Sequence, residues 1–310
     1  MQRIGLGLAA LGRPGYMTLH HGRDLDGDYA PADMEARAHA VLEAAYAAGV
    51  RYIDVARSYG RGEAFLGSWL ASRREGLTVA SKWGYTYTAD WRVDADPPEI
   101  KDHSIATLRR QIVESWGQLG ANLAIYQIHS VTSESPVLRD AQVLDMLARL
   151  RAMGIRIGLT VSGDDQADVI RRAMDVRRDG ERVFDVVQAT WNLLERGAEH
   201  ALCEAHAAGL TVVVKEALAN GRLAEPDAKR ERLRAVAARV NATPDQVAIA
   251  AVLARPWVDV VLSGAATVPQ LLSNIRSCEL YWDEAIEQFL APLAMSSNEY
   301  WALRRSFVWN

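Results

Sequence analysis

Short apolar runs alternate along the chain with longer segments in which apolar residues recur at helical spacing. Over 31–48, for example, Ala38 and Val41 fall on one face of a predicted helix, which Gly49 ends. The run Arg51–Asp54 that follows has the composition of a buried strand. The pattern therefore predicts strands and helices in regular succession.

Eight strands are predicted, each followed by a helix, and no block consists of strands alone. The strands fall at 4–8, 51–54, 77–81, 123–128, 155–161, 184–188, 210–214 and 258–262. The helices fall over 31–48, 63–70, 105–119, 140–152, 165–177, 198–208, 227–239, 244–254 and 268–277. Such alternation is typical of parallel strands, and eight repeats in 310 residues predict an α/β protein with a closed (β/α)8 TIM barrel. We expect a single domain over residues 1–310 with long loops.

A doubly wound open sheet is the alternative fold. It would carry a G-x-G-x-x-G turn between its first strand and first helix. The segment Gly5–Ala10 reads GLGLAA, which lacks the third glycine, and a polar loop over 12–32 follows it instead of a helix. The barrel is therefore the favoured fold.

Composition narrows the class of protein. Hydrophobic residues make up 49% and charged residues 24%, which is ordinary for a globular enzyme, and the net charge of −4 gives no sign of a nucleic-acid partner. No apolar run approaches the roughly 20 residues of a membrane span, and the N-terminus does not resemble a signal peptide. Cys203 and Cys278 form no disulfide framework, and His20–His21 lack further ligands at metal-site spacing. We expect a cytoplasmic protein without a metal.

Four polar residues stand at the ends of neighbouring strands or just after them: Asp54, Tyr59, Lys82 and His129. Alone, each fits an ordinary role, such as a helix cap, a packed phenol, a surface lysine or a satisfied histidine. A barrel brings these strand ends together at one face. We expect Asp54 to pair with Lys82, and the ammonium to lower the pKa of Tyr59 and make it a general acid or base. His129 could donate a hydrogen bond to a substrate oxygen.

These residues sit in motifs that resemble the aldo-keto reductases. The motifs are GVRYIDVARSYGRGEAFLG, TVASKWG, AIYQIHS, VVQATWNLLER and VLSGAATVPQLLSNI, and the resemblance runs from Ile4 to about Cys278. It implies a (β/α)8 barrel that reduces carbonyls with NAD(P)H. It also implies that Tyr59 is the proton donor, that Asp54 and Lys82 tune it, and that His129 orients the carbonyl.

The resemblance also implies a set of residues that hold the nucleotide. They are Ser162, Gln188, Trp191, Lys215, Leu218, Asn220, Gly221, Arg222, Gly264, Ala265, Ala266, Gln270 and Asn274. Two positions depart from the family: Gly163 replaces an Asn beside Ser162, and Lys215 replaces an aromatic that stacks on the nicotinamide. Either the stem of Lys215 covers the ring, or Trp191 covers it and Lys215 fills the gap.

The preferred nucleotide is expected to be NADPH, with NADH possible. Arg222 suits a phosphate, and the helix starting near Val268 would offer its N-terminus to the adenosine 2′-phosphate. However, Gly264 and Gln270 stand where some members of the family have a Lys and an Arg, so the preference should be modest.

Aromatic residues gather in the segments that would border the substrate. Trp83, Tyr85 and Trp91 follow the third strand, and Trp301 lies in a C-terminal loop, about 279–310, that the resemblance places over the mouth. They either line a pocket for apolar or ring-bearing carbonyls or form a packed cluster under the loops.

Three functions are compatible with these observations. The first is NAD(P)H-dependent reduction of aldehydes or ketones, or the reverse oxidation of an alcohol or sugar. The second is a nucleotide-binding regulatory subunit resembling the potassium-channel β subunits, and the presence of His129 with the other three residues favours the enzyme instead. The third is a barrel hydrolase or isomerase, which predicts no cofactor. The sequence indicates a small-molecule partner and leaves substrate, direction and oligomeric state open.

Overall fold

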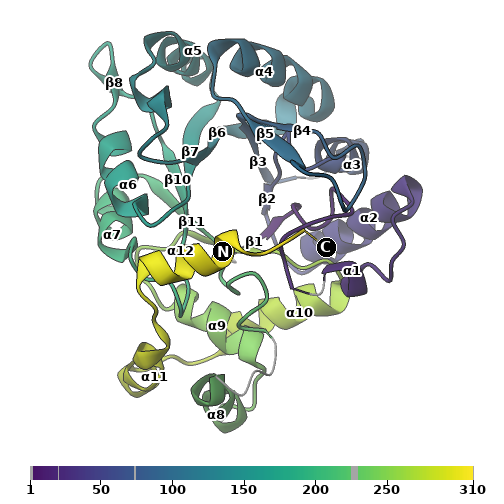
Figure 1. Cartoon of the computed structure of the whole chain (residues 1–310), viewed down its shortest axis with the longest axis vertical. Helices are drawn as coiled ribbons and strands as arrows, with labels where there is room; N and C mark the ends of the chain where they lie inside the picture. Colours follow the sequence, from purple (N-terminus) through teal and green to yellow (C-terminus); the bar gives the residue numbers. More distant parts are fainter. Residues whose placement is uncertain (1–2, 20, 73–74, 225–229, 310) are drawn as a thin grey trace.

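The computed structural model describes residues 3–19, 21–72, 75–224 and 230–309. Its centre is a closed barrel of eight parallel strands in the order β1-β12-β11-β10-β7-β6-β3-β2 (Figure 1). The strands are β1 Ile4–Gly7, β2 Tyr52–Asp54, β3 Thr78–Trp83, β6 Leu123–Val131, β7 Arg156–Val161, β10 Val186–Thr190, β11 Thr211–Lys215 and β12 Val260–Ser263. The predicted (β/α)8 barrel is confirmed.

Helices surround the barrel, and each predicted helix is present with ends shifted by a few residues. They are α2 Pro31–Ala47, α3 Gly62–Leu70, α4 Ile105–Leu119, α5 Ala141–Ala152, α6 Gln166–Met174, α7 Glu199–Ala207, α8 Glu231–Arg239, α9 Pro244–Leu253 and α10 Val268–Arg276. In α4, Leu108, Ile112 and Leu119 form the buried face, and Ser104 caps the N-terminus by accepting from the Thr107 amide. None of the helices in the described part of the chain is long and apolar enough to cross a membrane.

The barrel interior is built in layers. Its lower part holds an apolar cluster of Tyr52, Ala80, Ile125, Val186, Val213 and Leu262. Side chains alternate along a strand, so the next inward-facing residues on four of these strands are Asp54, Lys82, Gln127 and Gln188. The following inward positions are His129, Thr190 and Lys215. The polarity of the interior therefore rises towards the carboxyl ends of the strands.

Several segments that were expected to be loops form regular structure. The loop over 83–102 contains an antiparallel hairpin, and the C-terminal segment folds into helices because Ser296 and Glu299 form a capping box. A second hairpin follows α6. These elements are α1 His21–Asp24, β4 Tyr85–Tyr87, β5 Glu99–Lys101, β8 Arg177–Arg178, β9 Glu181–Arg182, α11 Glu284–Leu290 and α12 Ser297–Arg305, with short 3-10 turns η1 Gly120–Asn122, η2 Pro136–Arg139, η4 Ser277–Glu279 and η5 Ala291–Leu293.

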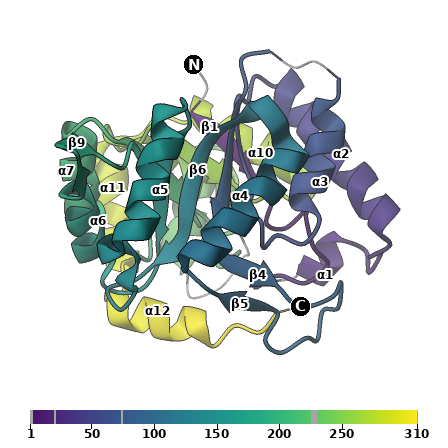
Figure 2. The same cartoon turned by 90° about the horizontal axis from the view of Figure 1, so that it is seen from above.

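The added elements gather at one end of the barrel. Figure 2 shows α12, the β4–β5 hairpin and α1 together at the end opposite the N-terminus. This is the end to which the carboxyl termini of the parallel strands point, where the polar layers lie. From these added elements, Glu99 of β5 and Arg304 of α12 line the cavity that lies over the polar layers.

Candidate active site

The floor of the site is a buried carboxylate. Asp54 ends β2, and its carboxylate forms an ion pair with the ammonium of Lys82 from β3. Two amides reach the same group: Gln188 Nε2 donates to Asp54 Oδ2 over 2.8 Å and Gln127 Nε2 over 3.2 Å. Lys82 Nζ also donates to the Val55 carbonyl over 3.0 Å. The two buried charges are therefore fully hydrogen-bonded, which is the condition under which such a pair is tolerated in an interior.

Tyr59 lies above this pair, on the loop between β2 and α3. Its hydroxyl lies 3.3 Å from Lys82 Nζ, which donates to it. The pKa of Tyr59 lies well above its ordinary value, because burial disfavours the phenolate and the Asp54 carboxylate repels it. The sequence led us to expect a lowered pKa. The difference arises because burial, together with repulsion from Asp54, outweighs the attraction of nearby cations such as Arg13 for the phenolate. Tyr59 therefore holds its proton at neutral pH.

His129, from β6, lies beside the phenol. Its ring centre lies 5.6 Å from that of Tyr59 at an interplanar angle of 78°, and 5.0 Å from that of Tyr85. Burial and the nearby ammonium of Lys82 hold the pKa of His129 well below its usual value, so the imidazole is neutral. The structure thus brings all four sequence-predicted catalytic residues together.

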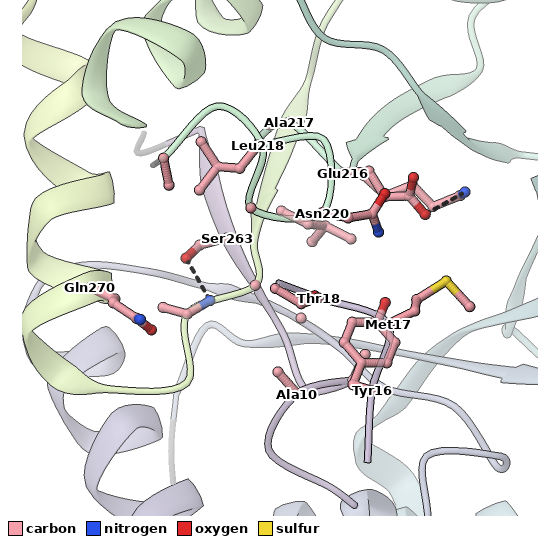
Figure 3. Close-up of a pocket in the computed structure, with 18 of the residues that line it drawn as sticks. Ala10, Tyr16, Met17, Thr18, Glu216, Ala217, Leu218, Asn220, Ser263 and Gln270 are labelled. Carbon is pink, nitrogen blue, oxygen red and sulfur yellow. Dashed lines mark hydrogen bonds and ion pairs between the residues drawn. The ribbon is translucent and has the colours of Figure 1, made fainter. Parts of the chain in front are cut away.

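A cavity of about 540 Å³ opens over Tyr59 and His129 and extends towards α10. Figure 3 shows its two long walls, with Tyr16, Met17 and Thr18 on one side and Ala217, Leu218 and Asn220 on the other. The remaining predicted nucleotide residues that line it are Ser162, Gln188, Lys215, Gly221, Gly264, Ala265, Gln270 and Asn274. Its volume lies within the range of about 300–1,000 Å³ that is typical of small-molecule sites.

The two walls touch each other. The Leu19 amide donates to the Asn220 carbonyl over 3.1 Å, and Gly221, at φ +89°, lies where a side chain would meet Leu19. Glu216, Ala219 and Asn220 on the same loop also have positive φ. Such backbone strain in non-glycine residues clusters at ligand sites. The loop after β11 is therefore held in a shape that closes over the cavity.

Residues 3–289 match the family model described as the Aldo/keto reductase family. The chain belongs to this family. It is 29% identical over 307 residues to Protein tas of Escherichia coli strain K12, covering 81% of this chain and 87% of that protein. It is also 29% identical over 212 residues to a D-threo-aldose 1-dehydrogenase of a Pseudomonas species, covering 63% of each. The fold is like that of an aldo-keto reductase from Bacillus halodurans in its holo form, with a TM-score of 0.70, 19% identity and coverage of 95% and 92%.

The cavity of this aldo-keto reductase has features that fit a nicotinamide nucleotide. Asn220 Oδ1 is buried and has no hydrogen-bond partner among the described residues, and it belongs to the cavity wall. Gly264 lines the cavity, and no atom lies within 4 Å of the point where a Cβ would stand at this residue. The cavity therefore joins the Tyr59 end to the start of α10 and presents an unsatisfied amide oxygen between them.

Three predicted nucleotide contacts of the reductase, Trp191, Arg222 and Ala266, lie outside the cavity lining. Trp191 is fully buried against Trp257, with ring centres 5.8 Å apart, and the Arg255 guanidinium lies 4.8 Å from its ring. Arg222 is stacked 4.4 Å above the Tyr300 ring, and its Nε donates to the Ala219 carbonyl over 2.8 Å. These side chains turn into the packed layer behind the loop instead of towards the cavity. Ala266 is buried, and its amide donates to Gln270 Oε1 over 2.9 Å.

The N-terminus of α10 offers fewer free backbone N–H groups to a phosphate than the sequence led us to expect. Thr267 caps the helix by accepting from the Gln270 amide, and Pro269 has no amide hydrogen. Asp245, from α9, lines this end of the cavity, and its carboxylate accepts from the Ser273 hydroxyl over 2.7 Å. The far end is therefore bordered by a carboxylate that the sequence analysis did not single out.

Of the two interpretations of the loop aromatics, the geometry favours a packed cluster under the loops over a pocket lining. Trp83 is fully buried and packs against His103, while Trp301 is buried against Tyr300. Trp91 packs against Phe65. The four predicted pocket aromatics, Trp83, Tyr85, Trp91 and Trp301, lie outside the cavity lining. Two of them contact residues that line it: Tyr85 lies beside His129, and the Lys215 ammonium lies 5.9 Å from the ring centre of Trp301. Aromatic content predicts packing but not the direction in which the rings point.

Charged residues border the Tyr59 end instead. Arg13 donates to Glu99 over 2.8 Å and lies 5.0 Å from the Tyr59 ring centre, and its other face lies 4.1 Å from the ring of Trp309. Two nitrogens of the Arg304 guanidinium from α12, Nε and Nη2, donate to the two carboxylate oxygens of Glu216. Sequence reasoning missed these pairs because each joins residues far apart in the chain. Among the described residues no group of three His, Cys, Asp or Glu side chains could hold a metal, and His20 lies outside the described residues.

Proposed function

We propose that this aldo-keto reductase reduces an aldehyde or ketone, or carries out the reverse oxidation, with a nicotinamide dinucleotide. The observation that carries the proposal is the protonated Tyr59, hydrogen-bonded to Lys82 at 3.3 Å and facing a cavity of about 540 Å³ that extends to Gln270 and Asn274 of α10. The nicotinamide ring supplies the hydride when it is bound. Ser162, Gln188, Asn220 and Gly221 are the residues of the cavity wall that would hold the nucleotide.

Tyr59 would act as the general acid. Its hydroxyl would transfer its proton to the carbonyl oxygen, and neutral His129 would donate a hydrogen bond that orients the same oxygen. The phenolate left behind lies beside the Lys82 ammonium, which stabilises the negative charge as it forms. Asp54 keeps Lys82 in position. General acid catalysis of this kind contributes about 10²–10⁴-fold to the rate.

The substrate would be a polar, hydroxyl-bearing carbonyl compound such as a sugar aldehyde. The substrate end of the cavity is bordered by Arg13, Glu99, Glu216 and Arg304, together with Ser130. Paired carboxylates and guanidinium groups offer further acceptors and donors to hydroxyls, whereas an apolar ring would displace water from them without replacing its hydrogen bonds. The similarity to an aldose dehydrogenase supports the same class.

The nucleotide preference would lie with NADH, against the expectation from sequence. Arg222 is turned away from the cavity and stacks on Tyr300. The backbone N–H of Gln270 already donates to the Thr267 side chain, and the Asp245 carboxylate borders the far end of the cavity. Arg23 and Asp24 of α1 also line the cavity and oppose each other in charge. A carboxylate repels a 2′-phosphate but accepts hydrogen bonds from ribose hydroxyls, as acidic residues do in other dinucleotide sites.

A spectrophotometric assay tests the proposal. The purified protein is mixed with NADH or NADPH and a panel of aldoses, small aldehydes and aromatic ketones, and the loss of absorbance of the reduced nucleotide is followed. We expect turnover with at least one aldose. Nucleotide binding without turnover across the panel and in the reverse direction would favour a regulatory subunit, and absence of nucleotide binding would favour a hydrolase or isomerase.

A further inference from the structure

Lys215 is the last residue of β11, and its ammonium is fixed inside the mouth of the barrel. Lys215 Nζ donates to Thr190 Oγ1 over 2.9 Å and to Ser162 Oγ over 3.4 Å. Its side chain is 16% exposed and forms part of the cavity wall. Two hydroxyls from neighbouring segments therefore hold a cation at a defined point of the site.

The register of the strands places this cation beside the reacting centre. Thr190 of β10 pairs with Lys215, and Gln188, which lies two residues earlier on β10, pairs with Val213. Gln188 is the residue whose amide reaches Asp54. Lys215 thus lies one inward-facing layer above the floor formed by Asp54. A nicotinamide ring bound over Asp54 and next to Tyr59 would lie at this level. A hydride donor must lie about 3–3.5 Å from the carbonyl carbon, so a nicotinamide ring could not be far from this layer.

The charge of Lys215 is only partly balanced. The closest carboxylate oxygen, Glu216 Oε1, lies 3.8 Å from Nζ, but both carboxylate oxygens of Glu216 accept from Arg304. The group of Lys215, Glu216 and Arg304 therefore carries one excess positive charge. The other two pairs at this end, Asp54 with Lys82 and Arg13 with Glu99, are each neutral as a unit.

The sequence left two ways to cover the nicotinamide face, and the structure separates them. Trp191 is fully buried behind the strand against Trp257 and is not part of the cavity wall. Lys215 is part of that wall. The lysine, and not the tryptophan, is therefore the side chain that meets a bound ring.

We propose that Lys215 is a specificity-determining residue that makes the site hold the reduced nicotinamide in preference to the oxidised one. The inference rests on the proposed function, because it requires a nicotinamide ring at the Tyr59 end. The oxidised ring carries a positive charge and the reduced ring does not, so a fixed ammonium at short range destabilises only the oxidised complex. The Lys215 ammonium would therefore weaken the binding of the oxidised nucleotide relative to that of the reduced nucleotide.

The test is a pair of dissociation constants, measured at pH 7 by isothermal titration calorimetry for the oxidised and the reduced form of the better-bound nucleotide. Lys215→Met keeps the stem and removes the charge. We expect it to lower the ratio of the oxidised to the reduced dissociation constant by about tenfold, equivalent to about 1.4 kcal/mol. Lys215→Arg keeps the charge and should keep the parental ratio to within about threefold, or about 0.65 kcal/mol, which separates the effect of charge from that of altered packing.

The matched control is Lys101→Met. Lys101 Nζ donates to the carbonyl of Ser130, next to His129, over 2.8 Å, but the residue is not part of the cavity wall. Its loss should leave the ratio unchanged. An unchanged ratio in Lys215→Met, with both forms still bound, would overturn the inference and leave the proposed function intact. Failure of the parent protein to bind either form would instead overturn the proposed function, and the inference with it.

A pH series gives a second readout. Burial lowers the pKa of Lys215 to about 8, although Glu216 opposes this shift. The parental ratio should therefore fall as the pH rises through about 8, because the neutral amine no longer repels the oxidised ring. The charged or titratable groups that face Lys215 are Glu216, Arg304, Lys82, Asp54 and His129. Lys215→Met should abolish the change, and persistence of the same fall in that variant would assign it to one of these other groups and overturn the inference.

Discussion

Tyr59 holds its proton firmly in the resting protein, and yet a cation lies ready to stabilise the phenolate that forms when the proton leaves. Burial keeps its proton on, which a general acid requires, while Lys82 lies 3.3 Å away to receive the charge that forms later. Burial decides the balance in the resting protein, and repulsion from the Asp54 carboxylate acts in the same direction. A proton donor that would be weak in isolation thus has its stabilising partner already in place.

The substitution Tyr59→Phe tests this assignment. It removes the hydroxyl and keeps the packed ring, so we expect nucleotide binding to remain and the rate of carbonyl reduction to fall by about 10²–10⁴-fold. The rate with an aldose and the dissociation constant of the nucleotide are measured on the same preparation. A variant that reduces substrate at nearly the parental rate would show that another group donates the proton.

Asp245 carries a prediction at the other end of the cavity. Asp245→Asn removes a negative charge from the α10 end of the cavity, where the proposed function would place the adenosine half, so we expect the affinity for NADPH relative to NADH to rise by about tenfold. Asp168→Asn, at an exposed aspartate on α6, is the control. Fluorescence titration with both nucleotides gives the ratio. The proposal of an NADH preference fails if the parent already binds NADPH more tightly.

The packing of α3 against α4 depends on one glycine. A Cβ added at Gly67 would overlap the Gln118 carbonyl oxygen, whereas one added at Gly117 of α4 meets nothing within 4 Å. We expect Gly67→Ala to lower the free energy of unfolding by about 1–3 kcal/mol through overpacking. Gly117→Ala should raise it by up to about 1 kcal/mol, because alanine favours the helix. Urea denaturation of the two variants checks both signs.

The attachment of α12 depends on the pair between Arg304 and Glu216. Arg304 and Lys215 lower the pKa of Glu216 to about 2, although burial acts in the opposite direction. Its contribution to stability is therefore present above the ordinary pKa near 4.5 and is lost as the pH falls towards 2. We expect Arg304→Gln to lower the free energy of unfolding at pH 7 by about 2 kcal/mol or more, because a buried carboxylate loses its main partner.

The neighbouring Arg305 provides the matched control for α12, because it is exposed. Arg305→Gln should change the free energy of unfolding by less than about 0.5 kcal/mol. Equal effects of the two substitutions would mean that the Glu216 pair does not hold the helix.

At the scale of the whole molecule, the sequence was most informative about residues whose position follows directly from the strand that carries them. The alternation of strand and helix predicted the barrel, and the strand ends predicted that Asp54, Tyr59, Lys82 and His129 meet. It was least informative where a side chain must choose a direction. The loop aromatics turned into packed clusters, and Arg222 turned towards Tyr300, because the partners that attract them come from distant segments. The pairs Arg13–Glu99 and Glu216–Arg304 were missed for the same reason.

The barrel closes between its first and last strands, where Ile4 pairs with Val261. This contact joins residues that are separated by almost the whole alternating region, and such non-local pairing slows folding because the ends of a long loop must meet. Until β12 arrives, β1 and β11 each present an unpaired edge, which is a template for pairing with another chain. A nascent chain of this protein therefore keeps these two edges open until residues 260–263 have been made, so we expect its yield in the cell to depend on chaperones that shield those edges.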